Sequence, residues 1–367
     1  MTARVTTMAV YVVATVLSCW FAWRAEKAER KWPWWIAAAL PLVLVAAARW
    51  GLGTDVNRLY WPQFMAVQAH FDGTSFPHAR MLWRNFNLEE PAYRWLVRGI
   101  VACGGSFRWF LVITSLVTGA LVSTAIFRQS RSPALAFYFY VATSNYFLSL
   151  NIVRQYVAIG FVLLAVGFAV DRRFVRFALC MAAAALFHRS ALLALPVVAL
   201  PFVNVRLRWC FAAVLVALVS ASFLVPAIRW ALPRIGLGIY VKYFKARVSK
   251  DGFEWFFFAI NLCFMALGAW YFRRAAAQSR FYSAWYYMTV LGTVALAFSG
   301  VVPLMKRVNY YYAAPQFLML PEMLAAEENP RLRKFLSVAM VLAFAAETAV
   351  AVVLLNKNQP LPYRLFR

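Results

Sequence analysis

Long apolar runs, separated by short charged stretches, make up most of the chain from residue 5 to residue 355. A helix that crosses roughly 30 Å of hydrocarbon needs about 20 apolar residues, and shorter helices can span inside a bundle. The pattern therefore predicts a polytopic, all-α membrane protein with about twelve membrane-spanning helices. They are expected near residues 5–23, 33–49, 106–127, 133–149, 151–170, 173–188, 190–204, 208–229, 253–273, 282–300, 305–325 and 334–355.

Two longer segments, residues 50–105 and 230–252, separate some of these spans. Within the first, residues 91–104 are apolar but carry Arg94 and Arg98, which indicates an interfacial or half-inserted helix. We expect one transmembrane domain over residues 1–367, in which both segments form outer-face loops with short interfacial helices.

The composition supports this reading. Of 367 residues, 64% are hydrophobic and only 14% are charged. Soluble domains are nearer half apolar and a quarter charged, so a soluble fold is excluded. The five cysteines are scattered and form no disulfide framework or CxxC pair. The first apolar run continues past Cys19 through Trp23, which favours a retained helix over a cleaved signal.

The net charge is +25, but the basic residues lie between apolar runs rather than on a soluble patch, so nucleic acid is not an expected partner. With twelve spans, the short basic loops fall on one side, which the positive-inside rule makes the cytoplasm. These loops are near residues 24–31, 128–131, 172–176, 206–208, 273–280 and 331–334. Both termini then face outward.

The remaining basic residues cluster in the two outer segments. Long loops escape the positive-inside rule, so insertion does not explain these cations. They either contact anionic lipid headgroups or meet an anionic substrate outside the membrane, and we favour the substrate.

Polar groups at the ends of spans are functional candidates, because charge beside lipid is costly. Asp55 follows two glycines at the outer end of the second span, close to Arg49. Its carboxylate can act as a general base, or it can cap a helix over residues 56–70. Glu90, just before Pro91, either begins a helix or places a carboxylate in a cleft.

Asn151, Arg154 and Gln155 stand at i, i+3 and i+4 and are expected to share one helical face. The arginine fork suits phosphate oxygens, and the amides can complete the coordination. The alternative is that Arg154 snorkels to the interface. Three polar groups on one face favour a site.

Two further motifs lie at predicted span ends. His188 joins two short spans, so it is expected in a water-filled cavity below the outer interface, either exchanging a proton or holding a structural hydrogen bond. Arg307 precedes Tyr310 and Tyr311 at the start of a later span and sets a cation beside phenol groups. Interfacial tyrosines are also common membrane anchors.

Several chemistries find no motif. The sequence has no zinc-ligand spacing, no P-loop or dinucleotide fingerprint and no G-x-S-x-G elbow. No metal and no cofactor is expected, and a site built from Arg, Asp, Glu and His is left.

Five motifs follow one another along the chain. They are R-x-G-x-G-T-D…Y (Arg49 to Tyr60), E-P-x-Y (Glu90 to Tyr93), N-x-x-R-Q-x-x-A (Asn151 to Ala158), F-H-x-S-A (Phe187 to Ala191) and R-x-x-Y-Y (Arg307 to Tyr311). In this order they resemble the EpsG-like branch of the Wzy-type bacterial polysaccharide polymerases. Val56 departs from that family, much of which has an aromatic residue at this position.

The resemblance implies an inner-membrane glycosyltransferase with a GT-C-like fold, whose site faces the periplasm. It would transfer a growing glycan from undecaprenyl diphosphate to the terminal sugar hydroxyl of a lipid-linked repeat unit. Implied partners are the undecaprenyl-diphosphate-linked oligosaccharide, the bilayer, and a flippase and chain-length regulator of the same pathway.

The residues suit this reaction. Arg154 and Arg307, with Arg49 or Arg189, can stabilise the charge of the leaving diphosphate. Asp55, His188 and Glu90 are the candidate bases, with Asp55 or His188 favoured. Basic side chains of the outer segments are expected to cover the site (Arg80, Arg84, Arg94, Lys242, Lys245 and Arg247).

Two rival functions stay open. A ligase or another GT-C transferase would share the arginines but use a different acceptor. A transporter or flippase for an anionic lipid or glycan would need charges through the membrane midplane, whereas these crowd the outer ends.

Overall fold

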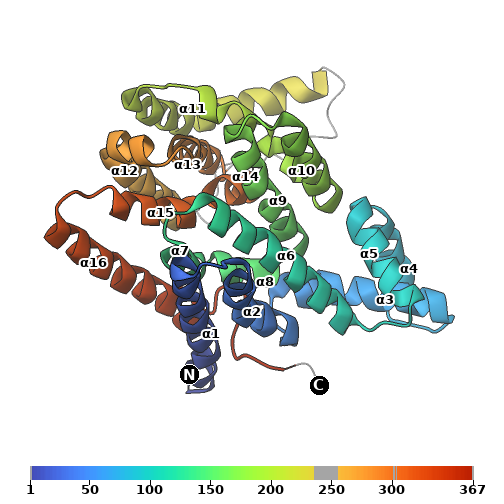
Figure 1. Cartoon of the computed structure of the whole chain (residues 1–367). Coiled ribbons are helices and arrows are strands. Elements are labelled where there is room, and N and C mark those ends of the chain that lie inside the picture. Colours follow the sequence, from blue (N-terminus) through green and yellow to red (C-terminus); the bar gives the residue numbers. More distant parts are fainter. Residues whose placement is uncertain (1, 235–254, 301, 303, 366–367) are drawn as a thin grey trace.

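The computed structural model describes residues 2–234, 255–300, 302 and 304–365 of the chain (Figure 1). Within these ranges the fold is all-helical, and the only strand-like pairing is one bridge between Arg49 and Leu365. The helices of the first half are α1 (Thr2–Lys27), α2 (Trp32–Ala48), η1 (Val56–Tyr60), α3 (Trp61–Asp72), α4 (Ala79–Asn87), α5 (Pro91–Ala102), α6 (Phe107–Gln129), α7 (Pro133–Ala142), α8 (Asn145–Asn151) and α9 (Val153–Val170).

The second half packs against α9 and α7. Its helices are α10 (Phe174–Phe187), η2 (Arg189–Val198), η3 (Leu200–Phe202), α11 (Leu207–Arg234), α12 (Trp255–Gln278), α13 (Tyr282–Ala297), α14 (Leu304–Ala313), α15 (Gln316–Ala325), α16 (Pro330–Thr348) and η5 (Ala349–Leu354). Nearly all of α9 is buried, and it contacts α6, α10 and η2. Gly160 lets α6 approach α9, because a Cβ there would lie 2.8 Å from the Leu121 side chain.

Five helices in the described ranges are long and apolar enough to cross a membrane. They are Ala3–Lys27, Phe107–Gln129, Val153–Val170, Trp255–Gln278 and Pro330–Leu354. Helix α11 adds a sixth if its two parts, bent by 65°, form one span. The chain is therefore a multi-pass membrane protein, although twelve spans are not confirmed.

Several expected spans are broken or short. The expected helix over 133–149 ends at Ala142 and restarts at Asn145, because Ser144 has a left-handed backbone with φ of 60°. The expected helix over 305–325 divides into α14 and α15 at Pro315, which has no N–H to donate. Residues 190–204 form short 3₁₀ helices rather than an α-helix.

Residues 50–105 fold into their own small helical unit. η1, α3, α4 and α5 lie together at one side of the molecule in Figure 1, away from α16. Their buried aromatic side chains include Tyr60, Phe64, Phe86 and Tyr93 and pack against the start of α6. Because this core also includes Val153, the unit is held directly against the first turn of α9.

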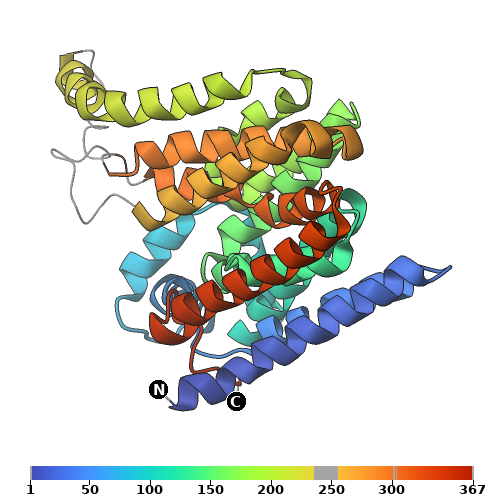
Figure 2. The same ribbon diagram turned by 90° about the vertical axis from the view of Figure 1, so that its left-hand side faces the viewer.

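The two ends of the chain meet at the same end of the molecule, as Figures 1 and 2 both show. The N–H of Trp50 donates to the carbonyl of Arg364 (2.8 Å), and that of Gly53 to the carbonyl of Gln359 (3.2 Å). The C-terminal segment therefore braces the turn that follows α2.

Candidate functional site

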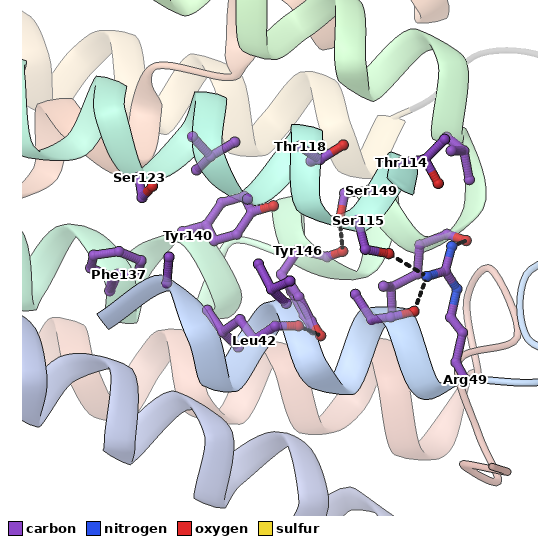
Figure 3. Close-up of a pocket in the computed structure, with 17 residues that line it drawn as sticks. Leu42, Arg49, Thr114, Ser115, Thr118, Ser123, Phe137, Tyr140, Tyr146 and Ser149 are labelled. Atoms are coloured by element: carbon purple, nitrogen blue, oxygen red, sulfur yellow. Dashed lines mark hydrogen bonds between the residues drawn. The ribbon is translucent and has the colours of Figure 1, made fainter. Parts of the chain in front are cut away.

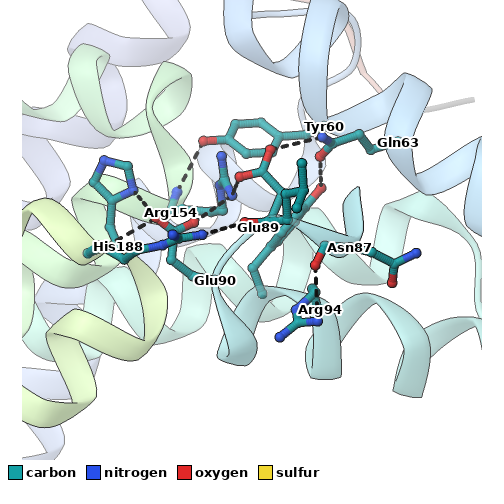
Figure 4. Close-up of polar contacts among 11 residues, drawn as sticks. Tyr60, Gln63, Asn87, Glu89, Glu90, Arg94, Arg154 and His188 are labelled. Atoms are coloured by element: carbon teal, nitrogen blue, oxygen red, sulfur yellow. Dashed lines mark hydrogen bonds and ion pairs between the residues drawn. The ribbon is translucent and has the colours of Figure 1, made fainter. Parts of the chain in front are cut away.

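A buried ion network joins the helical unit of residues 50–105 to α9. Nη1 of Arg154 lies 2.5 Å from Oε2 of Glu89 and 2.8 Å from Oε2 of Glu90 (Figure 4). Arg154 is 7% exposed and Glu90 6%. A buried charge is costly unless it is paired, and here one cation faces two carboxylates. Arg154 therefore does not snorkel, and its Nη1 binds protein carboxylates.

Aromatic rings and a glutamine enclose this network. The Arg154 guanidinium lies 4.6 Å from the ring centroid of Tyr93 and 5.4 Å from that of Tyr60. Such cation–π contacts stabilise an arginine that has left water. Gln63 accepts a hydrogen bond from Tyr93 Oη and donates one to Glu89 Oε1, both at 3.0 Å. The two rings and the Gln63 amide thus hold Arg154 and Glu89 in place.

Glu90 connects the network to His188. Oε1 of Glu90 lies 3.1 Å from Nδ1 of His188 and accepts from the backbone N–H of Arg189 at 3.2 Å. The histidine contact has the distance of an ion pair, without the alignment of a hydrogen bond.

These neighbours keep Glu90 ionised. Burial alone would raise the pKa of Glu90, but His188 and Arg154 outweigh burial and lower this pKa to about 2. A carboxylate with so low a pKa is a weak base near neutral pH. It is well suited to orienting an imidazole and to stabilising that imidazole when it becomes charged.

The position of Glu90 follows from its local sequence. Glu90 is the N-cap residue of α5, and Pro91 occupies the first helical position. Glu90 therefore begins a helix, and its side chain is buried against Arg154 and His188. His188 ends α10 in an extended conformation, and its side chain is 13% exposed.

A second group lies beside the pair of Glu90 and His188. Oη of Tyr311 lies 3.1 Å from Oγ of Ser190, which joins α14 to η2. Nε2 of Gln155 donates to the carbonyl of Arg307 at 2.7 Å. The side chains of Arg189 and Arg307 are exposed, so two cations flank this edge of the site.

Asn151 has a different set of partners from Arg154. Its Oδ1 accepts from Thr54 Oγ1 at 3.1 Å and from the backbone N–H of Asp55 at 2.8 Å. The sequence predicts that Asn151, Arg154 and Gln155 share one helical face. They do not, because the helix breaks at Ile152, between α8 and α9. Asn151 binds the turn before η1, Arg154 binds the two carboxylates, and Gln155 binds the start of α14.

Asp55 precedes the helix that starts at Val56, as expected, but its side chain makes no capping hydrogen bond. The turn before it is tight. Gly53 has φ of 92°, and a Cβ there would lie 3.0 Å from the carbonyl oxygen of Leu150. Asp55 lies close enough to Tyr60 to act on it electrostatically, while the ion pairs of Arg154 are with Glu89 and Glu90.

Arg49 lies inside the bundle, 2% exposed (Figure 3). Its guanidinium donates to the carbonyls of Ala46 and Leu150 and to Oγ of Ser115. These carbonyls belong to the last turns of α2 and α8, where a cation is favourable. A cavity of about 30 Å³ adjoins Arg49 and holds one or two waters at most. A role for Arg49 in substrate binding stays a prediction.

The remaining expected residues lie elsewhere. Tyr310 lines a separate cavity together with Lys306. Arg94 donates to the carbonyl of Asn87, and Arg80 and Arg84 lie on α4. Lys242, Lys245 and Arg247 lie outside the described residues.

Sequence reasoning missed Glu89, Gln63 and the enclosing role of Tyr60 and Tyr93. Tyr60 and Gln63 are three residues apart, so their common helical face was a readable signal. Glu89 offered none beyond its place next to Glu90. Within the described ranges, no three His, Cys, Asp or Glu side chains are arranged to hold a metal ion.

The fold and the site define a multi-pass, all-helical membrane protein with a buried Arg–Glu–His network. Residues 32–365 match the model of the EpsG family, and the chain belongs to this family. Members of the family are polymerases of glycosyltransferase type. No curated protein sequence and no solved structure matches the chain significantly.

Proposed function

We propose that this protein is a polysaccharide polymerase of the bacterial cytoplasmic membrane with its site at the periplasmic face. It transfers a glycan from undecaprenyl diphosphate to the terminal sugar hydroxyl of another lipid-linked repeat unit. It needs no cofactor or metal. The observation that carries the proposal is the ion network of Arg154, Glu90 and His188, which lies at the predicted outer end of α9.

In this mechanism His188 is the general base. With Nδ1 directed at Glu90, Nε2 is left to accept the proton of the attacking hydroxyl. The oxygen then bonds to the anomeric carbon of the donor, and the bond from this carbon to the diphosphate oxygen breaks. The electron pair of that bond leaves with undecaprenyl diphosphate.

Glu90 and Arg154 position this base. Glu90 stabilises the imidazolium that forms, and Arg154 keeps Glu90 ionised and oriented. This assignment differs from a direct phosphate clamp at Arg154, because two carboxylates already contact its Nη1. Arg189 and Arg307 are exposed and suit the diphosphate better, although Nη2 of Arg189 also donates to the carbonyl of Leu88. Tyr311 and Gln155 hold the helices that carry them.

The test is complementation of a deletion strain, read as a gel ladder of surface polysaccharide. Arg154→Ala should leave only bands in which the acceptor carries a single repeat unit, while the protein remains inserted in the membrane. Arg98→Ala is the matched control, because Arg98 contacts Asn87 and the Trp83 ring and is not part of the network.

The other outcomes separate the rival functions. A full ladder from Arg154→Ala would contradict the proposal. Loss of these single-unit bands as well as of long chains in the deletion strain would favour a ligase. An unchanged ladder in the deletion strain would leave only a transporter whose cargo is not this glycan.

A further inference from the structure

A second polar cavity, of about 120 Å³, lies against a different face of α14. One water needs only about 10–15 Å³, so there is room for several water-sized groups. Lys306, Asn309 and Tyr310 line this cavity, whereas Arg307 and Tyr311 lie at the Glu90–His188 site. Helix α14 is therefore a wall shared by two polar sites.

Three buried amides form one side of the cavity. Nδ2 of Asn261 donates to Oδ1 of Asn309 at 2.7 Å, and Nε2 of Gln316 donates to Oδ1 of Asn261 at 3.0 Å. All three side chains are at most 5% exposed. Each amide offers two donors and two acceptor lone pairs, so the chain leaves capacity for a ligand.

Glu347 brings a carboxylate into the cavity from α16. Its Oε2 is buried and has no hydrogen-bond partner within the described chain. A buried carboxylate oxygen without a donor is costly, so a ligand that carries hydroxyl groups would satisfy it. Lys306 and Lys357 line the same cavity, so both signs of charge are present beside this carboxylate.

Cationic and aromatic groups complete the lining. Nζ of Lys357 lies 3.6 Å, and Nζ of Lys306 5.4 Å, from the ring centroid of Phe257. Small-molecule sites commonly combine apolar and aromatic walls with a few convergent polar groups. Amides, a carboxylate and aromatic rings together suit a polyhydroxylated ring.

The cavity is joined to the proposed active site by a short chain of contacts. Asn358 lines the cavity, and its Oδ1 accepts from Nδ2 of Asn151 at 3.2 Å. Asn151 in turn holds the turn at Asp55. The cavity is therefore a neighbour of the turn that carries Asp55.

We propose that this cavity binds one sugar ring of the lipid-linked glycan, away from the bond that reacts. Glu347 accepts a hydrogen bond from a ring hydroxyl, and the amides of Asn309 and Gln316 bind neighbouring oxygens. The inference rests on the proposed function and assigns a second subsite to the same glycan.

The test uses the full-length protein in nanodiscs and the repeat-unit oligosaccharide released by mild acid from the host's polysaccharide. Saturation-transfer NMR and a titration measure its binding. Glu347→Gln keeps the shape but removes the charge, and should weaken binding about tenfold, as loss of a charge-assisted hydrogen bond predicts. Glu328→Gln is the control, because the Glu328 side chain is 75% exposed.

His188→Ala separates this inference from the proposed function, because it should abolish polymerisation and still bind the oligosaccharide. Wild-type affinity in Glu347→Gln would overturn the subsite, even if polymerisation depends on His188. Inorganic pyrophosphate is also tested as a competitor of the oligosaccharide. If it competes more strongly in Glu347→Gln than in wild type, the cavity is an anion site and the subsite is overturned.

Discussion

At the scale of single residues, the site depends on one carboxylate held by three partners. Arg154, His188 and the backbone N–H of Arg189 all contact Glu90. The sequence identified Glu90, Arg154 and His188 as separate candidates. It did not predict that they pair, because 64 residues separate Glu90 from Arg154 and periodicity gives a face rather than a partner.

The low pKa of Glu90 predicts how stability depends on pH. In the unfolded chain the pKa is 4.5 and in the folded protein about 2, so the folded protein favours the ionised form. This stabilisation is fully present above pH 4.5 and is lost as the pH falls towards 2. Wild type should therefore lose thermal stability over this range more steeply than Glu90→Gln. Parallel melting curves for the two proteins would contradict this ionisation.

Replacing the guanidinium of Arg154 by an ammonium group is a second test at this scale. Arg154→Lys keeps the charge that Nη1 presents to both carboxylates, but loses the planar guanidinium that lies over the Tyr60 and Tyr93 rings. We expect polymerisation to fall at least tenfold, with little change in the amount of inserted protein. Initial rates of polymer formation in membranes measure the effect, and a wild-type rate would show that charge alone suffices.

At the scale of elements, the breaks between helices determine which way the polar side chains point. Ser144 interrupts the expected span over 133–149, and Ile152 separates α8 from α9 close to the expected boundary at 149–151, so Asn151 and Arg154 diverge. The apolar pattern predicted an all-helical membrane protein, because lipid requires apolar helices. It missed the break at Ser144, because no proline or glycine marks that position.

The turn before η1 offers a backbone test. Gly53→Ala forces a non-glycine residue into φ of 92° and brings its Cβ within 3.0 Å of Leu150 O. We expect a loss of about 1–3 kcal/mol in stability, measured as a lower melting temperature in detergent. Gly99→Ala in α5 is the control, because its Cβ would meet nothing within 4 Å. Equal melting temperatures for the two variants would contradict the strain at Gly53.

At the scale of the whole molecule, the network, the two flanking arginines and the sugar cavity all lie towards the predicted outer side. The N-termini of α9, α12 and α14 contribute to them. A polymerase that uses lipid-linked substrates needs this one-sided arrangement, whereas a transporter needs access from both sides.

This orientation can be tested by cysteine labelling. In a variant that keeps Cys103 as its single cysteine, this exposed residue after α5 should react with an impermeant maleimide added outside the cell. Ala277→Cys, exposed near the end of α12, should react only after the membrane is permeabilised. The reverse pattern would place the Arg154 network on the cytoplasmic side.

The central claim, that His188 takes the proton of the attacking hydroxyl, is tested most directly by chemical rescue. The purified protein, reconstituted with lipid-linked repeat units, should lose at least about 100-fold in rate in His188→Ala. Added imidazole should restore part of this rate, which a purely structural histidine would not allow. His70→Ala, in which a ring stacked on Trp83 is lost, should polymerise normally. Full activity of His188→Ala without imidazole would contradict the mechanism.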